Sequence, residues 1–149
     1  MTRYHLKDLT IARMYGFTDV FKLTNTDLTQ SANNTQQSVN LTTLNLGDIV
    51  NQEVLLEVRT ASTGLATCTA SVGVTGAVTQ LIGASDCVAG NLYFVPTGST
   101  ASYPTIAAGK SLLVNFTPGA SEALNACTAL ELYVWCSITR LTDRNTIQF

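Results

Sequence analysis

Charged residues are scarce in this chain: they make up 12% of its 149 residues, whereas ordinary soluble domains carry about 25%. The formal net charge is −2, and the whole sequence holds eight Lys and Arg. So few basic residues cannot form the cationic footprint that a phosphate backbone requires, and we expect no nucleic-acid partner. The other polar positions are mostly Thr, Ser, Asn and Gln, which gives a neutral, hydrogen-bonding surface suited to contacts with other proteins.

Long apolar segments are also missing. No apolar run approaches the roughly 20 residues needed to cross a bilayer, so we expect no membrane partner. Residues 1–8 carry charges where a secretory signal would have its apolar region, so we expect synthesis and folding in a cytoplasm. The length suits one domain large enough to fold without a metal or a disulfide.

Catalytic patterns are absent as well. The one histidine, His5, lies in an N-terminal segment that we expect to be an arm, which is a poor place to build a Ser-His-Asp or Cys-His arrangement. Glu53, Glu57 and Glu131 fall on the outward parity of predicted strands, where we expect solvated or interface side chains rather than a glycosidase pair. We therefore expect neither an enzyme nor a cofactor.

Residues 108–111, Ala-Gly-Lys-Ser, imitate the end of a phosphate-binding loop. Pro104 stands where that motif requires a glycine, and a strand-like run follows where the motif requires a helix. We therefore predict a tight turn that leads into a strand.

The four cysteines, Cys68, Cys87, Cys127 and Cys136, have none of the spacings typical of a structural zinc site, so we expect no metal. Cys68 and Cys136 fall on the buried parity of predicted strands, where they would serve as small apolar core residues. Cys87 and Cys127 lie in or near predicted loops. For them a disulfide formed after release from the cell is the alternative, and the sequence does not decide the pairing.

What the chain does have is alternation with a period of two. Residues 130–138 place apolar side chains at every second position without a fault, and residues 66–74 repeat the pattern. Seven or eight such runs at a spacing of roughly 8 to 12 residues, separated by Gly and Pro, predict an all-β domain, a single antiparallel β-sandwich that is jelly-roll-like. We assign residues 20–141 to this sandwich, residues 1–19 to an N-terminal arm or short helix and residues 142–149 to a C-terminal tail.

Tyr133 and Trp135 lie on the outward parity of the last long strand, where they carry more apolar area than an exposed sheet face normally tolerates. Their cover could be a loop or the arm of the same chain, a neighbouring subunit, or a sugar stacked on the rings. The tail ends on Ile147 and Phe149, which we expect to dock on a partner or on the body. These four residues are the predicted interface.

Residues 21–58, together with the strand TCTASVGV and the closing ELYVWCSITRL, resemble a group of tailed-bacteriophage structural proteins. The shared pattern has three parts. It is an Asp-Leu-Thr turn after an opening strand (Asp27, Leu28 and Thr29), a strand that ends in a Gly-Asp turn (Gly47 and Asp48), and a strand that ends in Ser-Val-Gly (Ser71, Val72 and Gly73).

The resemblance implies a small β-sandwich on the virion that decorates or cements the capsid, commonly as a homotrimer over junctions between major capsid protein subunits. It implies no catalytic residues. The N-terminal arm departs from the usual pattern, so the position on the virion is not implied. A hypothesis from a different class is a carbohydrate- or receptor-binding module of a phage fibre or head fibre, with Tyr133 and Trp135 as the stacking platform.

Overall fold

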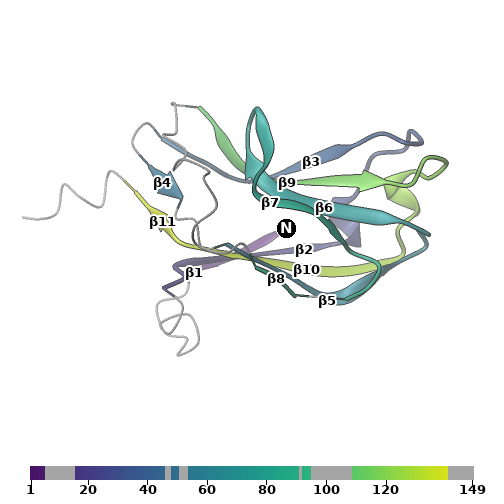
Figure 1. Cartoon of the computed structure of the whole chain (residues 1–149), viewed down its shortest axis with the longest axis horizontal. Helices are drawn as coiled ribbons and strands as arrows, with labels where there is room; N and C mark the ends of the chain where they lie inside the picture. The colour runs from purple at the N-terminus through teal and green to yellow at the C-terminus, as the bar shows by residue number, and fades with distance from the viewer. Residues whose placement is uncertain (6–15, 46–47, 51–53, 91, 95–108, 141–149) are drawn as a thin grey trace, which may run out of the picture.

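The computed structural model of the chain describes residues 1–5, 16–45, 48–50, 54–90, 92–94 and 109–140. Within these ranges the regular elements are strands and two short 3-10 helices, η1 (Asn25–Asp27) and η2 (Leu124–Ala126). The expectation of an all-β protein is confirmed: antiparallel sheets pack on each other, an arrangement consistent with a β-sandwich (Figure 1). No helix among the described residues is long and apolar enough to cross a membrane.

The larger sheet has five strands, and its central strand is the one that the alternation predicted most clearly. Its order is β1 (Thr2–His5), β2 (Asp19–Thr24), β10 (Ala129–Cys136), β5 (Leu55–Thr63) and β8 (Leu92–Phe94). All of its pairings are antiparallel. Strand β10 therefore has a hydrogen-bonded neighbour on each side, β2 and β5.

The smaller sheet has four strands and lies opposite the first (Figure 1). Its order is β3 (Gln37–Thr43), β9 (Ser111–Pro118), β6 (Cys68–Val74) and β7 (Ala77–Asp86). A separate pair, β4 (Ile49–Val50) with β11 (Ile138–Thr139), lies at one end. From β2 to β10 the chain passes back and forth between the two large sheets, except at the hairpin of β6 with β7 and at the short strand β4. Most other neighbours within a sheet are therefore distant in sequence.

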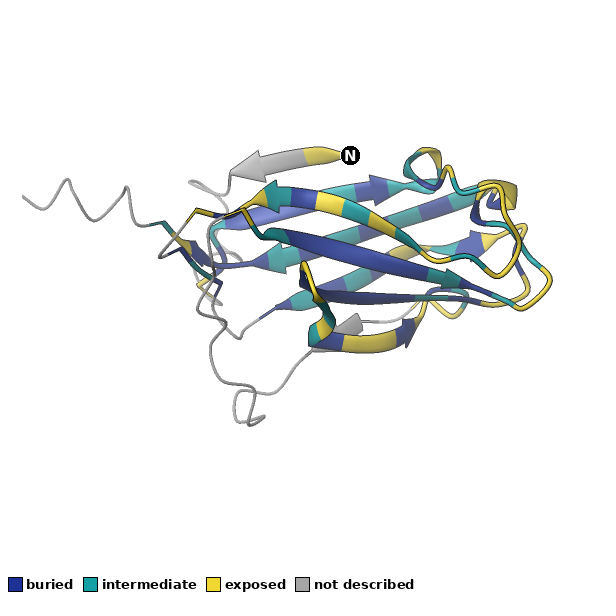
Figure 2. Cartoon of the chain, turned by 90° about the horizontal axis from the view of Figure 1, so that it is seen from above, coloured by how far each residue is buried: buried dark blue, intermediate teal, exposed yellow. Residues whose placement is uncertain are grey.

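The core lies between the facing sides of the two sheets, and side chains from both form one cluster. Its largest fully buried members include Phe21 from β2, Phe116 from β9 and Leu132 from β10. Along β10 buried and half-buried residues alternate at every position, as the period of two predicts (Figure 2). On β5 the alternation of the sequence predicts that Leu56 and Val58 face inward and that Glu57 and Arg59 face outward. The structure confirms this, because the first two are buried and the last two are not.

The N-terminal segment differs from the predicted arm or short helix. Residues Thr2–His5 form β1, which pairs with β2 at the edge of the five-stranded sheet. The segment is also bonded to the sheet near its C-terminal end, because the Thr18 amide donates to the carbonyl of Cys136 on β10 at 3.0 Å. Strand β2 begins at Asp19, one residue before the expected boundary. At both ends, the N-terminal segment is therefore part of the sheet.

The polar connection between β2 and β3 is held by its own side chains. The predicted Asp-Leu-Thr turn is present: Asp27 ends η1 and accepts a hydrogen bond from the Thr24 amide at 2.9 Å, and Leu28 enters the core. The Gln37 side chain binds the Thr29 amide and the Asp27 carbonyl, both at 2.8 Å. These bonds explain how a stretch with little apolar material adopts a defined path.

The sequence pattern predicts a short strand over residues 78–82 and a loop over residues 83–90, but the structure corrects this prediction. The strand continues to Asp86, and Ser85 pairs with Ala70 on β6. Its small residues and two register shifts remove the period of two that would have revealed it. Near the start of β7 the backbone passes closely over Gly73, where an added Cβ atom would lie 2.1 Å from the Ala77 carbonyl oxygen. The glycine of the Ser-Val-Gly motif is therefore needed for close packing.

Gly73→Ala should destabilise the protein by about 1–3 kcal/mol, because the new methyl group must displace the backbone of β7. The matched control is Gly83→Ala: an added Cβ there meets no atom within 4 Å, and a change below about 0.5 kcal/mol is expected. Urea unfolding of both variants measures the difference, and equal effects would contradict this account of Gly73.

The Glu122 carboxylate ties two loops together at the end of the sandwich. It accepts hydrogen bonds from the amides of Ala66 and Thr67, at 2.5 and 3.2 Å. These backbone donors hold the pKa of Glu122 below its ordinary value of 4.5. A depressed pKa in the folded state means that the ionised carboxylate stabilises the fold.

Stability from Glu122 should be fully present above about pH 4.5 and should be lost as the pH falls through the lower folded-state pKa. Glu122→Gln should therefore lower the free energy of unfolding at neutral pH, and the gap between variant and wild type should shrink at about pH 3. Urea titrations at both pH values test this. A gap of constant size would show that ionisation of Glu122 contributes nothing.

Candidate interaction surface

The outer face of the five-stranded sheet gathers charged and aromatic side chains from three neighbouring strands. Tyr133 on β10 lies directly opposite Lys22 on β2 and Glu57 on β5, while Trp135 lies between Val20 and Leu55. We call the following six residues the outer ladder: Lys22, Glu57, Arg59, Glu131, Tyr133 and Trp135. All six are outside the main core cluster, because they occupy the parity that points away from it.

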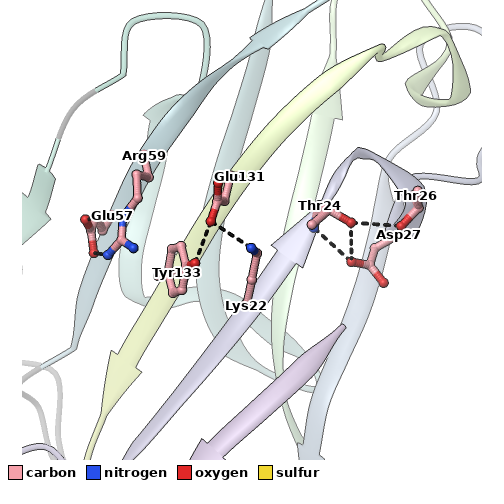
Figure 3. A network of polar contacts seen from close by, with 8 residues as sticks. All are labelled: Lys22, Thr24, Thr26, Asp27, Glu57, Arg59, Glu131 and Tyr133. Carbon is pink, nitrogen blue, oxygen red and sulfur yellow. Dashed lines mark hydrogen bonds and ion pairs between the residues drawn. The ribbon is translucent and has the colours of Figure 1, made fainter. Parts of the chain in front are cut away.

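Glu131 organises one end of the outer ladder. One of its carboxylate oxygens accepts hydrogen bonds from the Tyr133 hydroxyl at 2.5 Å and from the Lys22 ammonium at 2.8 Å (Figure 3). The Lys22 donor lowers the pKa of Glu131 the most, with Tyr133 second. A glycosidase general acid needs a raised pKa, so the environment of Glu131 works against that role.

Arg59 covers the ring of Tyr133. Its guanidinium carbon lies 4.1 Å from the ring centroid, and it forms two hydrogen bonds to the Glu57 carboxylate at 3.0 and 3.1 Å (Figure 3). A register shift between Glu131 and Leu132 interrupts the regular pairing of β10 with β5 beside this contact. A cation already occupies one face of Tyr133, which leaves that face closed to a stacked sugar.

Trp135 is the residue through which the ladder meets the N-terminal segment. Its indole nitrogen donates to Glu57 at 3.0 Å, and its ring lies 6.3 Å from the ring of Phe17, between centroids. Phe17 and Val20 are buried in a second, smaller apolar cluster against which Leu55, Tyr133 and Trp135 pack. We expected these two aromatic side chains to be covered by some other group. Part of that cover is Phe17 of the same chain.

The ladder is electrically balanced. It holds two cations, Lys22 and Arg59, and two carboxylates, Glu57 and Glu131, and each cation is paired with a carboxylate. Lys22 and Arg59 both have raised pKa values, chiefly because they donate to Glu131 and Glu57 respectively. The outer ladder therefore offers aromatic area and hydrogen-bonding groups with equal numbers of cations and carboxylates.

The predicted interface is only partly described. Tyr133 and Trp135 lie side by side on the outer face, with ring centroids 6.4 Å apart. Ile147 and Phe149, together with Glu53, lie outside the described residues. Phe17, Lys22 and Arg59 were not singled out from the sequence. The outward parity of β2 and β5 was a signal for the two cations, but Phe17 precedes its strand and carried no periodic signal.

The remaining motifs have structural positions. Gly109 forms a turn just before β9, as predicted for the Ala-Gly-Lys-Ser segment, although residue 108 itself lies outside the described part. All four cysteines are buried as free thiols. Asp48 of the Gly-Asp turn is buried and accepts a hydrogen bond from the Asn45 amide at 2.9 Å. In the described portion of the chain, no three His, Cys, Asp or Glu residues are grouped to hold a metal ion.

Lys22→Met should raise the pKa of Glu131, because it removes the strongest donor to that carboxylate. Carboxyl-carbon NMR titration measures the shift. Arg59→Met is the matched control, since Arg59 acts on Glu131 only through its charge and less strongly, so its effect should be smaller. An equal shift in both variants would contradict the hydrogen-bonded arrangement.

Comparison with known proteins adds no relative to this picture. No protein-family model, no curated protein and no solved structure matches the chain. A role for the outer ladder must therefore be argued from its own chemistry and from the order of the strands.

Proposed function

We propose that the protein is a virion structural protein, a decoration or cement protein that binds and stabilises the junctions between major capsid protein subunits. The observation that carries the proposal is the strand order β2-β10-β5-β8 opposite β3-β9-β6-β7. We interpret this order, with the chain passing between the sheets, as a jelly roll with β1 as an added N-terminal strand. Jelly rolls are frequent in viral capsid and lectin domains.

The outer ladder supports a role in protein contact. Trp135 and Tyr133 supply broad, rigid aromatic surface of the kind that anchors interfaces. The charges beside them are already paired, so a partner that covers the face need not bring compensating charges of one sign. In the proposed role the protein acts mechanically: a modest contact area, repeated by the symmetry of a homotrimer and of the shell, holds neighbouring capsid subunits together.

A carbohydrate- or receptor-binding module of a fibre is the second candidate, because lectin domains share the jelly-roll arrangement. Trp135 would be its stacking surface, since Arg59 covers one face of Tyr133. The contact between Phe17 and Trp135 reduces the open ring area further. These contacts favour the decoration role over glycan stacking.

The proposal predicts that Trp135→Ala abolishes binding to expanded heads of the phage that encodes the protein, or weakens it at least tenfold, while the fold is retained. Co-sedimentation with the heads measures binding, and far-UV circular dichroism checks the fold. Asn40→Ala, at an exposed position of β3 in the other sheet, is the matched control and should bind normally. Point variants are preferable to deletion of residues 1–17, because deletion would remove β1 from the sheet.

The single tryptophan gives an independent readout. On binding to heads, Trp135 fluorescence should become protected from acrylamide quenching, because the partner covers the outer ladder. Wild-type protein that ignores the heads but binds a glycan array through Trp135 would replace the decoration role with the fibre role. Head binding that survives Trp135→Ala unchanged would show that another face makes the contact.

A further inference from the structure

Cys68 and Cys87 lie opposite each other where β6 begins and β7 has just ended, at one end of the four-stranded sheet. The ladder pairs Ala70 with Ser85 and then Thr69 with Asp86, so the next pair along is Cys68 with Cys87. The Cys87 amide donates to the Cys68 carbonyl at 2.8 Å, which continues the ladder to this pair. Both side chains are buried in the main core, with exposed fractions of 1% and 0%.

The Cys87 thiol donates to the Ser85 carbonyl at 3.8 Å, and the two cysteine thiols are close enough for each to shift the pKa of the other. Residues directly opposite in an antiparallel pair have Cα atoms about 4.5–5.5 Å apart. Native disulfides span Cα separations of about 4.4–6.8 Å. A bond between the two sulfur atoms is therefore compatible with the strand pairing as it stands and requires no separation of β6 from β7.

We propose that Cys68 and Cys87 form an intramolecular disulfide when the folded protein meets a small-molecule disulfide such as glutathione disulfide. The Cys68 thiolate attacks one sulfur of the oxidant, which forms a mixed disulfide and releases one glutathione thiolate. The Cys87 thiolate then attacks the Cys68 sulfur of that mixed disulfide and releases the second glutathione. Two protein thiols are oxidised, one glutathione disulfide is reduced to two glutathione thiols, and the two protein protons pass to them.

The order of attack follows from the different surroundings of the two thiols. The neighbouring Cys87 thiol lowers the pKa of Cys68, while Cys68 and burial raise the pKa of Cys87. Cys68 is therefore the better first nucleophile. Since both sulfur atoms are buried, the oxidant gains access only when the edge strand β7 opens locally, so the reaction should be slow in the native state.

Cys127 is the competing partner for Cys87, and Ser62 on β5 contacts both: its amide donates to the Cys87 carbonyl at 2.9 Å, and its hydroxyl oxygen lies 3.5 Å from the Cys127 sulfur. The Cys127 sulfur itself donates to the Ala129 carbonyl at 3.3 Å. Only Cys68 continues the backbone ladder with Cys87, and Cys68 has the larger effect on the pKa of Cys87. The geometry therefore favours the bond between Cys68 and Cys87 over the bond between Cys87 and Cys127.

The test is incubation of the reduced, full-length protein with glutathione disulfide, followed by intact mass measurement and non-reducing peptide mapping. The expected product has lost two hydrogens, carries a link between Cys68 and Cys87, and melts about 10 °C higher than the reduced protein. Dithiothreitol should reverse all three changes. Cys136→Ala, at a buried cysteine of β10, should still form the link, whereas Cys68→Ala should not.

The wild-type peptide map decides the matter even where a cysteine variant fails to fold. A link between Cys87 and Cys127 would overturn the proposal, and so would a stable glutathione adduct without a link between the two cysteines. Thiols that stay unreacted at a temperature where the β7 amides exchange with solvent would overturn it as well. None of these outcomes depends on capsid binding, so the result is independent of the proposed function.

Discussion

Strand β10 lies between β2 and β5, and its strict alternation places half of its side chains in the core and half on the outer face. Leu132 and Val134 are fully buried, while the residues that follow each of them, Tyr133 and Trp135, belong to the outer ladder. A slip of one residue against either neighbour would exchange the two sets. The buried apolar set therefore fixes the register, and through it the positions of every residue in the ladder.

The register of the strands also determines which side chains of the outer ladder are neighbours, and so how its charges are paired. Lys22 and Glu57 come from opposite neighbours of β10 and meet its side chains at Tyr133. Each charged residue of the outer ladder has a partner of opposite charge within the ladder. A partner protein that covers the ladder therefore buries no unpaired ion, and burial of an unpaired ion is what costs the most free energy. Binding through this face would depend on aromatic contact and shape more than on long-range attraction, so its affinity should vary little with ionic strength.

Sequence reasoning succeeded where one physical pattern dominated. The period of two identified β10 and the inward residues of β5. The Asp-Leu-Thr turn was expected only from the family resemblance, and the structure shows Asp27 bonded to the Thr24 amide there. Sequence reasoning failed at β7, whose small residues and bulges leave no period, although the backbone pairs with β6 up to Asp86. An edge strand of this kind is held by hydrogen bonds that any residue can make.

The sequence pattern identified only two residues of the outer ladder as part of the predicted interface. Tyr133 and Trp135 stood out because large aromatics on an outward parity need cover. Their partners did not stand out, because Phe17 and Arg59 are distant in sequence and reach the aromatics only through strand order and a bulge. Pairings of this kind depend on tertiary register, which local patterns do not carry.

The most direct measurement is an electron cryomicroscopy reconstruction of expanded heads saturated with the protein. The account predicts ordered density at junctions between major capsid protein subunits, arranged as trimers, with the outer ladder of β2, β10 and β5 turned toward a protein neighbour. Heads that remain bare at saturating concentration, or bound protein whose outer ladder faces solvent, would contradict it.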